Sequence, residues 1–348
     1  MFQQTLSHTY KRYRTIKSHI IKVLPVVILM PHSACNCRCL MCDIWKGNLN
    51  VKQLTESDIN GLLESLKKFE TKKVLMSGGE ALLNPNFFKF CEILKKHEIR
   101  INLLSTGISL KKHAPLLAKW VDEIIVSLDG DQLTHDRIRN IPGAFEKLRE
   151  GVIQMKEINP SYKIAARTVI HKLNYRKWPD IIETAKIIGL NSISFLPADV
   201  SSHAFNRQVL WDENRQSEIL LPPEALPELK DIIEQLIIGY EKEFDDHFIL
   251  ESPEKIRGIY QYYAAFYGLN QFPHKQCNAP SVSTVIEADG AVRPCFFHNP
   301  MGNIRLNTLE EILNSSSAID FRKELNVNED PTCRKCVCYL HLRPRQTI

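Results

Sequence analysis

Between residues 23 and 198 the chain alternates between two hydrophobic patterns. Short apolar runs rich in β-branched residues are the form expected of buried strands, and they occur at residues 23–30, 73–77, 100–105, 123–128, 163–170 and 192–196. Apolar residues at every third or fourth position predict helices between them, at residues 55–69, 87–96, 110–120, 143–156 and 176–188. Strands that alternate with helices favour a parallel sheet covered by helices. Six such units fit a partial (β/α)6 TIM-like barrel, an α/β fold.

The pattern changes after residue 198. Residues 199–275 hold a predicted helix at 225–241 and a patch of aromatic residues, including Tyr262 and Tyr263. We expect this region to bridge two domains and to line the substrate side of the barrel. From residue 276 onward, short apolar runs flank an Asp-Gly pair that is typical of a hairpin turn. We therefore divide the chain into an N-terminal helix at 1–22, a barrel at 23–198, a bridging region at 199–275 and a cysteine-rich domain at 276–348.

The first 22 residues predict an amphipathic helix with a basic polar face. Its apolar side chains recur at helical spacing, at Phe2, Leu6, Tyr10, Tyr13, Ile16 and Ile20, with Lys11, Arg12, Arg14, Lys17 and Lys22 between them. Such a helix is suited to lie on an anionic membrane surface. Packing of the apolar stripe against a domain is the commoner use of such a face, so we expect the helix to pack on the barrel.

Composition and charge narrow the class of protein. The 348 residues are 44% apolar, as in an ordinary globular protein, and no apolar run approaches the roughly 18–20 residues that span a bilayer. The net charge of +5 comes from interspersed charges, so we expect no nucleic-acid partner. The start of the chain lacks the pattern of a secretory signal, and we expect a cytoplasmic protein.

The ten cysteines are grouped rather than spread along the chain. Four lie within residues 35–42 and five within 277–338. Grouped cysteines without a secretory signal indicate metal ligands rather than disulfides. Cys35, Cys39 and Cys42 have the spacing CxxxCxxC, and thiolate sulfur suits iron–sulfur clusters and zinc. Because a closed cluster takes four cysteines, three at this spacing predict a cubane with one open iron.

A second motif follows the second predicted strand. Gly78, Gly79 and Glu80 come directly after the strand at 73–77. Glycine has no Cβ and lets the backbone approach a ligand closely, and a glutamate accepts hydrogen bonds from an ammonium group. In barrels of parallel strands, the loops at the carboxyl ends build the active site. The cysteine loop and the Gly-Gly-Glu segment are therefore predicted at the same rim.

On these motifs the chain resembles the radical S-adenosylmethionine (SAM) superfamily, in particular members with an auxiliary cluster domain of the twitch or SPASM type. The resemblance runs from Val26 to Cys338. It implies that Cys35, Cys39 and Cys42 hold a [4Fe–4S] cluster whose open iron binds SAM. One electron from the cluster would cleave SAM to a 5′-deoxyadenosyl radical, which abstracts hydrogen from a substrate. A structural zinc knuckle is the alternative, although such sites prefer four ligands.

The resemblance also implies the residues that bind SAM. Gly78, Gly79 and Glu80 would lie at its methionyl amine. The ends of the third, fourth and fifth strands would contribute Thr106, Ser127, Asp129 and Arg167. Ser127 and Asp129 alternate onto one face and would contact the ribose and methionine part. No catalytic side chain of the protein itself is predicted.

Several charged residues near these strands have two readings. Arg167 would bind the SAM carboxylate through a bidentate pair, whereas the alternative is an ordinary ion pair within the protein. Asp136, Arg137 and Arg139 follow the fourth strand and look like residues of the family. A solvated helix face explains these three equally well.

The C-terminal cysteines form a second set that resembles the twitch domain. Cys277, Cys295, Cys333 and Cys336 would close one auxiliary [4Fe–4S] cluster, with Cys338 spare or substituting for a neighbour. A structural zinc site with the same four ligands is the alternative. The cluster would accept an electron from a substrate radical or serve a structural role.

The resemblance implies an enzyme of oxidoreductase type, with flavodoxin or ferredoxin as electron donor. We expect an oxidation or rearrangement of a small molecule such as a sugar or aminocyclitol. The alternative is a maturase that modifies peptide side chains, although the thirty-four residues before Cys35 leave no room for a leader-binding domain. A non-catalytic iron–sulfur sensor is a third reading, and the complete set of SAM-site residues argues against it.

Overall fold

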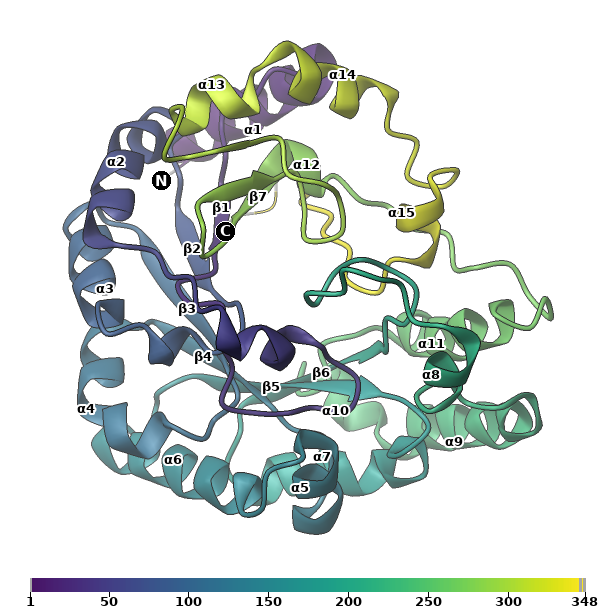
Figure 1. The fold of residues 1–348 in the computed structure, drawn as a ribbon. Helices are drawn as coiled ribbons and strands as arrows, with labels where there is room; N and C mark the ends of the chain where they lie inside the picture. Colours follow the sequence, from purple (N-terminus) through teal and green to yellow (C-terminus); the bar gives the residue numbers. More distant parts are fainter. Residues whose placement is uncertain (1, 344–345, 347–348) are drawn as a thin grey trace.

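The protein is built around one sheet that curls into an open barrel (Figure 1). The computed structural model describes residues 2–343 and 346, with side chains from residue 6 onward. Among these residues the sheet has the strand order β6-β5-β4-β3-β2-β1-β7-β8-β9. The strands are β1 (Val26–Leu29), β2 (Lys73–Met76), β3 (Arg100–Ser105), β4 (Glu123–Ser127), β5 (Ile164–Ile170), β6 (Ser192–Pro197), β7 (Ser283–Ile286), β8 (Ala291–Arg293) and β9 (Gly302–Asn303).

Helices cover the outside of the barrel, and further helices precede its first strand and follow its sixth strand (Figure 1). The barrel helices are α2 (Glu56–Lys68), α3 (Phe87–Lys96), α4 (Leu110–Trp120), α5 (Gln132–Arg139), α6 (Ala144–Ile158) and α7 (Trp178–Ile187). The others are α1 (Phe2–Ser18), α8 (Glu213–Ser217), α9 (Leu226–Gly239), α10 (Glu241–Asp245), α11 (Pro253–Ala265), α12 (Ala279–Val282), α13 (Leu309–Leu313), α14 (Ser316–Glu324) and α15 (Pro331–Lys335). The α/β fold expected from the sequence is confirmed.

The first six strands run parallel, and each pairs with the next along the chain. Burial alternates along β1, β2 and β4, because one side chain faces the helices and the next faces the barrel lumen. All six carboxyl ends therefore meet at one rim. The loops after β1, β2, β3 and β4 carry most of the residues predicted for the SAM site, whereas Ser127 and Arg167 lie within β4 and β5.

Several elements differ from the sequence prediction, among them the unpredicted helices α11 and α14, and two differences bear on the site. A short helix, α5, stands between β4 and α6, where no separate element was expected. The C-terminal domain also shares the sheet of the barrel, whereas the sequence predicted a separate domain after the barrel. Strand β7 pairs in parallel with β1, with Val26 opposite Ser283, and extends the barrel sheet. Strand β8 then pairs antiparallel with β7, as the hairpin signal predicted, and β9 pairs antiparallel with β8.

The bridging region closes one side of the barrel with α9 and α11. Tyr262 and Tyr263 on α11 are buried among the helices and strand ends rather than lining a substrate space. The backbone N–H of Ala198 donates to the Tyr263 hydroxyl at 2.9 Å, and the Tyr262 hydroxyl donates to the Ala198 carbonyl at 3.1 Å. These two tyrosines therefore fix the chain after β6. The expectation that they line the substrate side is wrong.

Helix α1 packs on the body of the protein through its polar side. Arg12 and Thr15 are buried, whereas Leu6, Tyr10 and Tyr13 are 62%, 59% and 50% exposed. The expectation that the apolar stripe packs on the barrel is therefore wrong. Hydrogen bonds and ion pairs from the buried side hold the helix, and a helical period alone does not say which side of a helix will find partners.

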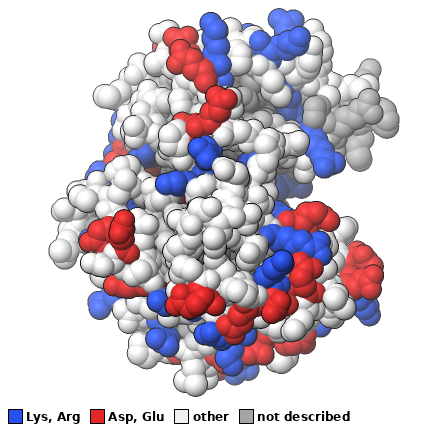
Figure 2. Space-filling model, turned by 90° about the vertical axis from the view of Figure 1, so that its right-hand side faces the viewer, with Lys and Arg blue, Asp and Glu red and all other residues white. Residues whose placement is uncertain are grey.

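Charged side chains of both signs are intermixed on one face of the molecule. The side of the molecule turned to the viewer in Figure 2, which carries α9 and α11, mixes acidic and basic side chains. Pairs such as Arg257 with Glu234, 2.7 Å apart, neutralise one another there. No helix among the described residues is long and apolar enough to cross a membrane.

Candidate active site

The cysteine loop after β1 is held by backbone bonds to the end of α5. The N–H groups of Arg38 and Leu40 donate to the carbonyls of Arg139 and Ile138, each at 3.0 Å. Cys35 is held from the other side, because its N–H donates to Asn48 Oδ1 at 3.0 Å. The loop therefore has a fixed path that does not depend on its thiols.

The four cysteines of this loop are buried or half-buried. Cys39 is 7% exposed, and Cys37, which the family pattern does not require, is 1% exposed. Hydrogen bonding from Cys37 and the charge of Arg139 lower the pKa of Cys39 to about 7, against the effect of burial. Burial raises the pKa of Cys42, and the thiolate charges of Cys39 and Cys35 add to this effect. Cationic groups are present to offset clustered thiolates.

The donors of this loop fit a cluster better than a single ion. Across residues 2–343, the one set of three potential ligands with donor atoms within 4.8 Å of one another is His298, Asp330 and Cys333. The sulfurs of Cys35, Cys39 and Cys42 do not all lie within 4.8 Å of one another. Three thiolate donors on one loop, with the Arg139 guanidinium beside them, suit a [4Fe–4S] group with one open iron, whereas structural zinc prefers four ligands, so the residues present fit the cluster.

A buried ion pair supports the cysteine loop from below. Arg139 Nε donates to Asp129 Oδ2 at 2.6 Å, and Arg139 Nη1 donates to Cys39 Sγ at 3.4 Å. Asp129 has no exposed surface, and Arg139 is 7% exposed. The reading of Arg139 as part of a solvated helix face is wrong. Arg137, two positions before Arg139 on α5, is exposed as that reading expects.

The two glycines of the Gly-Gly-Glu segment lie against the chain that leads into the cysteine loop. A Cβ on Gly79 would come within 2.2 Å of the Ala34 carbonyl oxygen, and one on Gly78 would come within 3.0 Å of the His32 oxygen. Gly78 also has a positive φ of 111°, which favours glycine. The close approach that requires these glycines is made by the protein's own backbone.

Glu80 is saturated by donors from the neighbouring strand end. Its carboxylate accepts from the backbone N–H of Thr106 at 2.8 Å and from the Ser105 hydroxyl at 3.0 Å. The Thr106 hydroxyl lies 2.8 Å from Glu80 Oε2 and 2.9 Å from Oδ1 of Asn36 in the cysteine loop. Burial raises the pKa of Glu80, and these donors oppose the shift. Glu80 and Thr106 thus join the ends of β2 and β3 to the cysteine loop.

A row of polar side chains crosses β4, β5 and β6 on the lumen side. Ser127 is opposite Arg167 in the register, and Arg167 is opposite Ser194. Arg167 Nε donates to the Ser194 hydroxyl at 3.3 Å, and among the described residues no carboxylate lies within 4.0 Å of its guanidinium. The alternative of an ordinary ion pair is therefore not what the structure shows. Ser194 was missed, because a serine inside a buried strand gives no functional signal of its own.

The segment after β6 folds over the cysteine loop. Arg207 is buried, pairs with Asp199 at 2.5 Å and donates to the Met41 carbonyl at 3.3 Å. Trp211 stacks beneath that guanidinium, whose carbon is 4.0 Å from the ring centroid. Trp211 Nε1 also donates to Asp43 at 2.7 Å. Sequence reasoning gave this segment a covering role without identifying these residues.

The C-terminal cysteines surround a cavity of about 30 Å³ between α12, β8 and α15. All five of them line it: Cys277, Cys295, Cys333, Cys336 and Cys338. Burial raises the pKa of Cys295 to about 11 and also raises that of Cys333 and Cys336. The four predicted ligands are thus brought together, and Cys338 reaches the same cavity from an exposed position.

Two further side chains of this cavity escaped the sequence analysis. His298 Nε2 lies 3.3 Å from Cys333 Sγ and 3.9 Å from Asp330 Oδ1. Lys275 is 5% exposed, and burial lowers its pKa, which the nearby cysteines oppose. Its ammonium group donates to the Arg334 carbonyl. A lone histidine and a lone lysine in sequence carried no signal, since only the fold places them beside the thiols.

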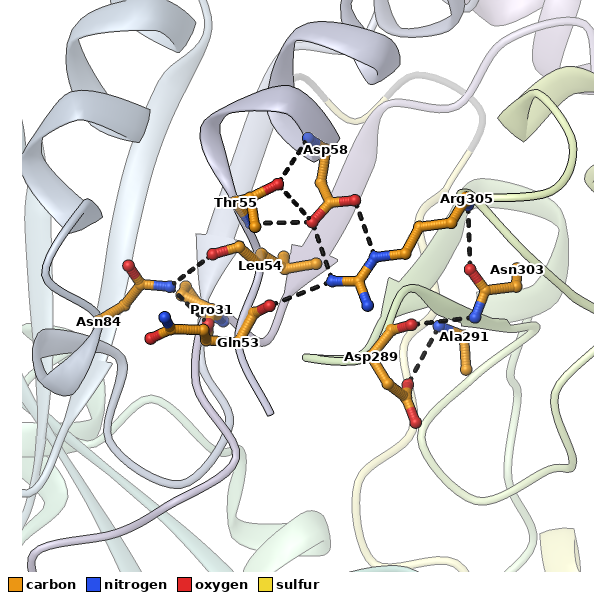
Figure 3. Close-up of polar contacts among 10 residues, drawn as sticks. All are labelled: Pro31, Gln53, Leu54, Thr55, Asp58, Asn84, Asp289, Ala291, Asn303 and Arg305. Carbon is orange, nitrogen blue, oxygen red and sulfur yellow. Dashed lines mark hydrogen bonds and ion pairs between the residues drawn. The ribbon is translucent and has the colours of Figure 1, made fainter. Parts of the chain in front are cut away.

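A polar network fastens the C-terminal hairpin to the barrel rim (Figure 3). Arg305 Nε and Nη2 each lie 2.9 Å from an oxygen of Asp58, at the start of α2, and Nη2 also donates to the Gln53 carbonyl. Thr55 caps the same helix with Asp58. Lys52 pairs with Asp289 of the hairpin at 2.8 Å. The segment that follows the cysteine loop is therefore tied to both parts of the molecule.

Comparison with known families explains the two cysteine sites. The model of the radical SAM superfamily matches residues 29–185, and a SPASM model, described as an iron–sulfur cluster-binding domain, matches residues 277–337. The chain belongs to the radical SAM superfamily. Membership in the radical SAM superfamily, with a SPASM domain, implies an enzyme that uses a [4Fe–4S] cluster, SAM and an auxiliary iron–sulfur cluster.

The relatives of this radical SAM protein are named for different enzyme activities. Fe-coproporphyrin III synthase of Methanosarcina barkeri is 24% identical, over 95% of this chain and 87% of the relative. AdoMet-dependent heme synthase of the same organism is 26% identical, over 45% of this chain and 46% of its own. A cysteine-type anaerobic sulfatase-maturating enzyme of Clostridium novyi is 25% identical, over 92% and 86%.

Solved structures show the same fold. SuiB of Streptococcus suis, bound to S-adenosylmethionine, has a TM-score of 0.64 over 93% of this chain and 74% of its own, at 13% identity. The enzyme anSMEcpe, with bound AdoMet and a peptide, has a TM-score of 0.62 over 90% and 88%, at 18% identity. These likenesses confirm the barrel and its C-terminal extension.

Proposed function

We propose that this protein is a radical SAM enzyme that modifies a tetrapyrrole bearing carboxylate side chains. The observation that supports the substrate class is the match to Fe-coproporphyrin III synthase, which spans 95% of this chain and 87% of the relative. A heme synthase matches within 45% of the chain. The sugar or aminocyclitol expected from the sequence has no counterpart among the relatives named above.

The two cysteine sets take the roles that their geometry favours. Cys35, Cys39 and Cys42 would hold the SAM-binding cluster, and the loop that carries them, with its path fixed by backbone bonds to α5, supports this role. Cys277, Cys295, Cys333 and Cys336 would hold the auxiliary cluster, since all four line one cavity. The bound cluster and SAM supply a 5′-deoxyadenosyl radical that removes hydrogen from the substrate.

The protein's own residues bind and orient SAM in this proposal. Arg167 offers a half-buried guanidinium with no carboxylate within 4.0 Å among the described residues, which suits the carboxylate of SAM. Ser127 stands beside it on β4 and Ser194 fixes its Nε on β6. Gly78 and Gly79 keep the backbone at the rim in place, where a carbonyl can accept from an ammonium group.

Glu80, Thr106 and Asp129 take supporting roles rather than direct ones. The carboxylate of Glu80 is filled by donors from β3, and Asp129 is fully buried against Arg139. Their side chains therefore position the strands and loop that bind SAM. Arg207, Trp211 and the segment around them keep water from the cysteine loop.

The substrate class is tested with the anaerobically reconstituted enzyme, dithionite and SAM. We expect an iron tetrapyrrole with acetate and propionate side chains to raise 5′-deoxyadenosine release at least about tenfold over the substrate-free rate, equivalent to roughly 1.4 kcal/mol of barrier. Deuterium placed on the side chains should appear in 5′-deoxyadenosine. Release that no tetrapyrrole stimulates would overturn the proposal.

A second candidate is the modification of a peptide side chain. The sulfatase-maturating relative supports it, because that match covers 92% of this chain and 86% of the relative. Cysteine- or serine-containing peptides, and an aminocyclitol, form parallel arms of the same assay. Stimulation by a peptide alone would favour this candidate.

A further inference from the structure

We propose that the outer face of α1 is a docking surface for anionic lipid headgroups. Its apolar stripe, Leu6, Tyr10, Tyr13 and Ile16, is between 42% and 62% exposed along one side of the helix. Among the described helices no other carries more than two large exposed apolar side chains: α6 has Ile153 and Ile158, and α7 has Ile187. A row of four on one helix is the kind of patch that marks a contact surface.

The buried side of α1 explains why this face remains outside. Arg12 donates to the carbonyls of Arg343 and Gln346, at 3.1 and 2.9 Å. Thr15 accepts from the N–H of Lys22 at 2.9 Å. Lys11 and His8 on the same side pair with Glu70. The helix is thus fixed in an orientation that presents the stripe.

Charge selects the occupant of this surface. Helix α1 contains four basic residues and no acidic one, and the first acidic residue of the chain is Asp43. Arg14 and Lys17 lie beside the stripe, 6.0 and 5.6 Å from the Tyr10 and Tyr13 rings. A second copy of this helix would bring like charges together, whereas an anionic membrane attracts them. Tyrosine and basic side chains at an apolar face are typical of interfacial helices.

The test uses the reconstituted full chain with vesicles of phosphatidylglycerol and phosphatidylcholine, or of phosphatidylcholine alone. We expect co-sedimentation with the anionic vesicles only, and a decrease as salt rises. The double variants Leu6→Ser/Tyr13→Ser and Arg14→Glu/Lys17→Glu should each weaken binding at least about tenfold. All four side chains are exposed, so the fold should persist.

Matched controls lie elsewhere on the surface. Ile187→Ser, at a position 82% exposed, and Lys112→Glu/Lys163→Glu, at two exposed lysines, should bind as the unchanged protein does. Equal sedimentation with both vesicle types, or equal loss in the controls, would overturn the proposal. Dimerisation that the Leu6→Ser/Tyr13→Ser variant abolishes, without vesicle binding, would assign the face to a second copy.

A separate observation carries a second inference: we infer that Arg139 is a positioning residue that sets the potential of the SAM-binding cluster. It rests on the proposed role of Cys39 as a ligand. Arg139 connects buried Asp129, at 2.6 Å, to Cys39 Sγ, at 3.4 Å. Its carbonyl also accepts from Arg38 N–H in the same loop. Hydrogen bonds to ligand sulfurs are among the factors that set cluster potentials.

The sign of the effect follows from charge. Reduction adds negative charge to the cluster, and a buried guanidinium that donates to its ligand stabilises that charge. Asp129 holds the guanidinium in this orientation. Arg139→Gln should therefore shift the midpoint potential to more negative values. Asp129→Asn removes the negative charge that neutralises this guanidinium, so it should shift the potential in the opposite direction, to more positive values.

Potentiometric titration followed by electron paramagnetic resonance measures this effect, with iron content and SAM affinity as further readouts. Arg139→Lys should give an intermediate potential, and Arg137→Gln, at an exposed position on the same helix, none. A fully loaded Arg139→Gln protein with unchanged potential would overturn the inference. The potential is read without substrate, so failure of the proposed tetrapyrrole reaction would leave this result intact.

Discussion

The two cysteine sites of this protein are held in place by different means. The N-terminal loop lies at the carboxyl ends of parallel strands, and backbone bonds from Arg38 and Leu40 fix its path. The ends of β2 and β3, the helix α5 and the segment after β6 all contact it. Its shape is therefore a product of the barrel core.

The C-terminal site has less structure around it. Cys333 lies on the five-residue helix α15, and its other cysteines lie in irregular chain next to α12, β8 and α15. Asp330 caps α15 through the N–H groups of Thr332 and Cys333, and the polar network of Arg305 fastens the hairpin to the barrel. Few apolar contacts stabilise residues 325–338 on their own.

The difference indicates what each metal group does for the fold. The barrel can hold the first cysteine loop before a cluster binds, whereas short cysteine-bearing segments gain much of their folding free energy from the metal group itself. Four experiments test whether the two sites differ in this way, beginning with the substitution that should change the protein most.

Loss of Cys39 should abolish activity without unfolding the protein. The Cys39→Ala variant should release no 5′-deoxyadenosine, and its iron content should fall from about eight to about four per chain. Circular dichroism should stay unchanged, because the loop is held by its backbone. Cys91→Ala, at the cysteine outside both groups, should keep both iron and activity. Retained 5′-deoxyadenosine release by Cys39→Ala would show that this loop does not bind the SAM cluster.

Removal of iron should loosen the two sites unequally. After chelation under reducing conditions, we expect amide hydrogen exchange to rise much more at residues 325–338 than at residues 32–42. The loop at 32–42 keeps its backbone bonds to α5 when the iron is removed. Mass spectrometry of peptides from both segments measures the difference. Equal increases would mean that the first loop also depends on its cluster for structure.

Loss of the Arg167 charge should weaken SAM binding with little effect on folding. Arg167→Gln removes a charge-assisted bond worth about 1.5–3 kcal/mol, so the dissociation constant should rise by roughly 10- to 100-fold. Ser194→Ala, which frees the guanidinium from its 3.3 Å contact, should cost a few-fold. Equilibrium binding of SAM measures both, with Arg137→Gln as control. An unchanged constant for Arg167→Gln would remove this row from the site.

The smallest effect is expected from the network that joins the two sites. Arg305→Ala should lower the free energy of unfolding by about 1 kcal/mol, measured in urea against Lys230→Ala, which lies exposed on α9. Burial acts to raise the pKa of Asp58, but Arg305 and Thr55 outweigh it and lower the pKa. The contribution should therefore be present above the unfolded pKa of about 4 and disappear as pH falls through the lowered value. A difference that persists at lower pH would point to packing instead.

Much of the fold follows from local pattern. The strands and most barrel helices agree with the predicted ranges within a few residues, because alternation and helical spacing report burial directly. Helix α5 was missed because its residues, Gln132–Arg139, are mainly polar. The pairing of β7 with β1 joins residues more than 250 positions apart, and no local pattern encodes such a contact.

The sequence alone determined the family, the barrel and the two groups of cysteines, since spacing along the chain carries that chemistry. Only the tertiary structure decided which side of α1 faces outward, that Arg139 lies beneath Cys39, and that Glu80 is filled by Ser105 and Thr106. The physical reason is that a periodic pattern defines a face, whereas the partner of that face comes from residues distant in sequence. Burial and hydrogen bonding then assign each polar group its role.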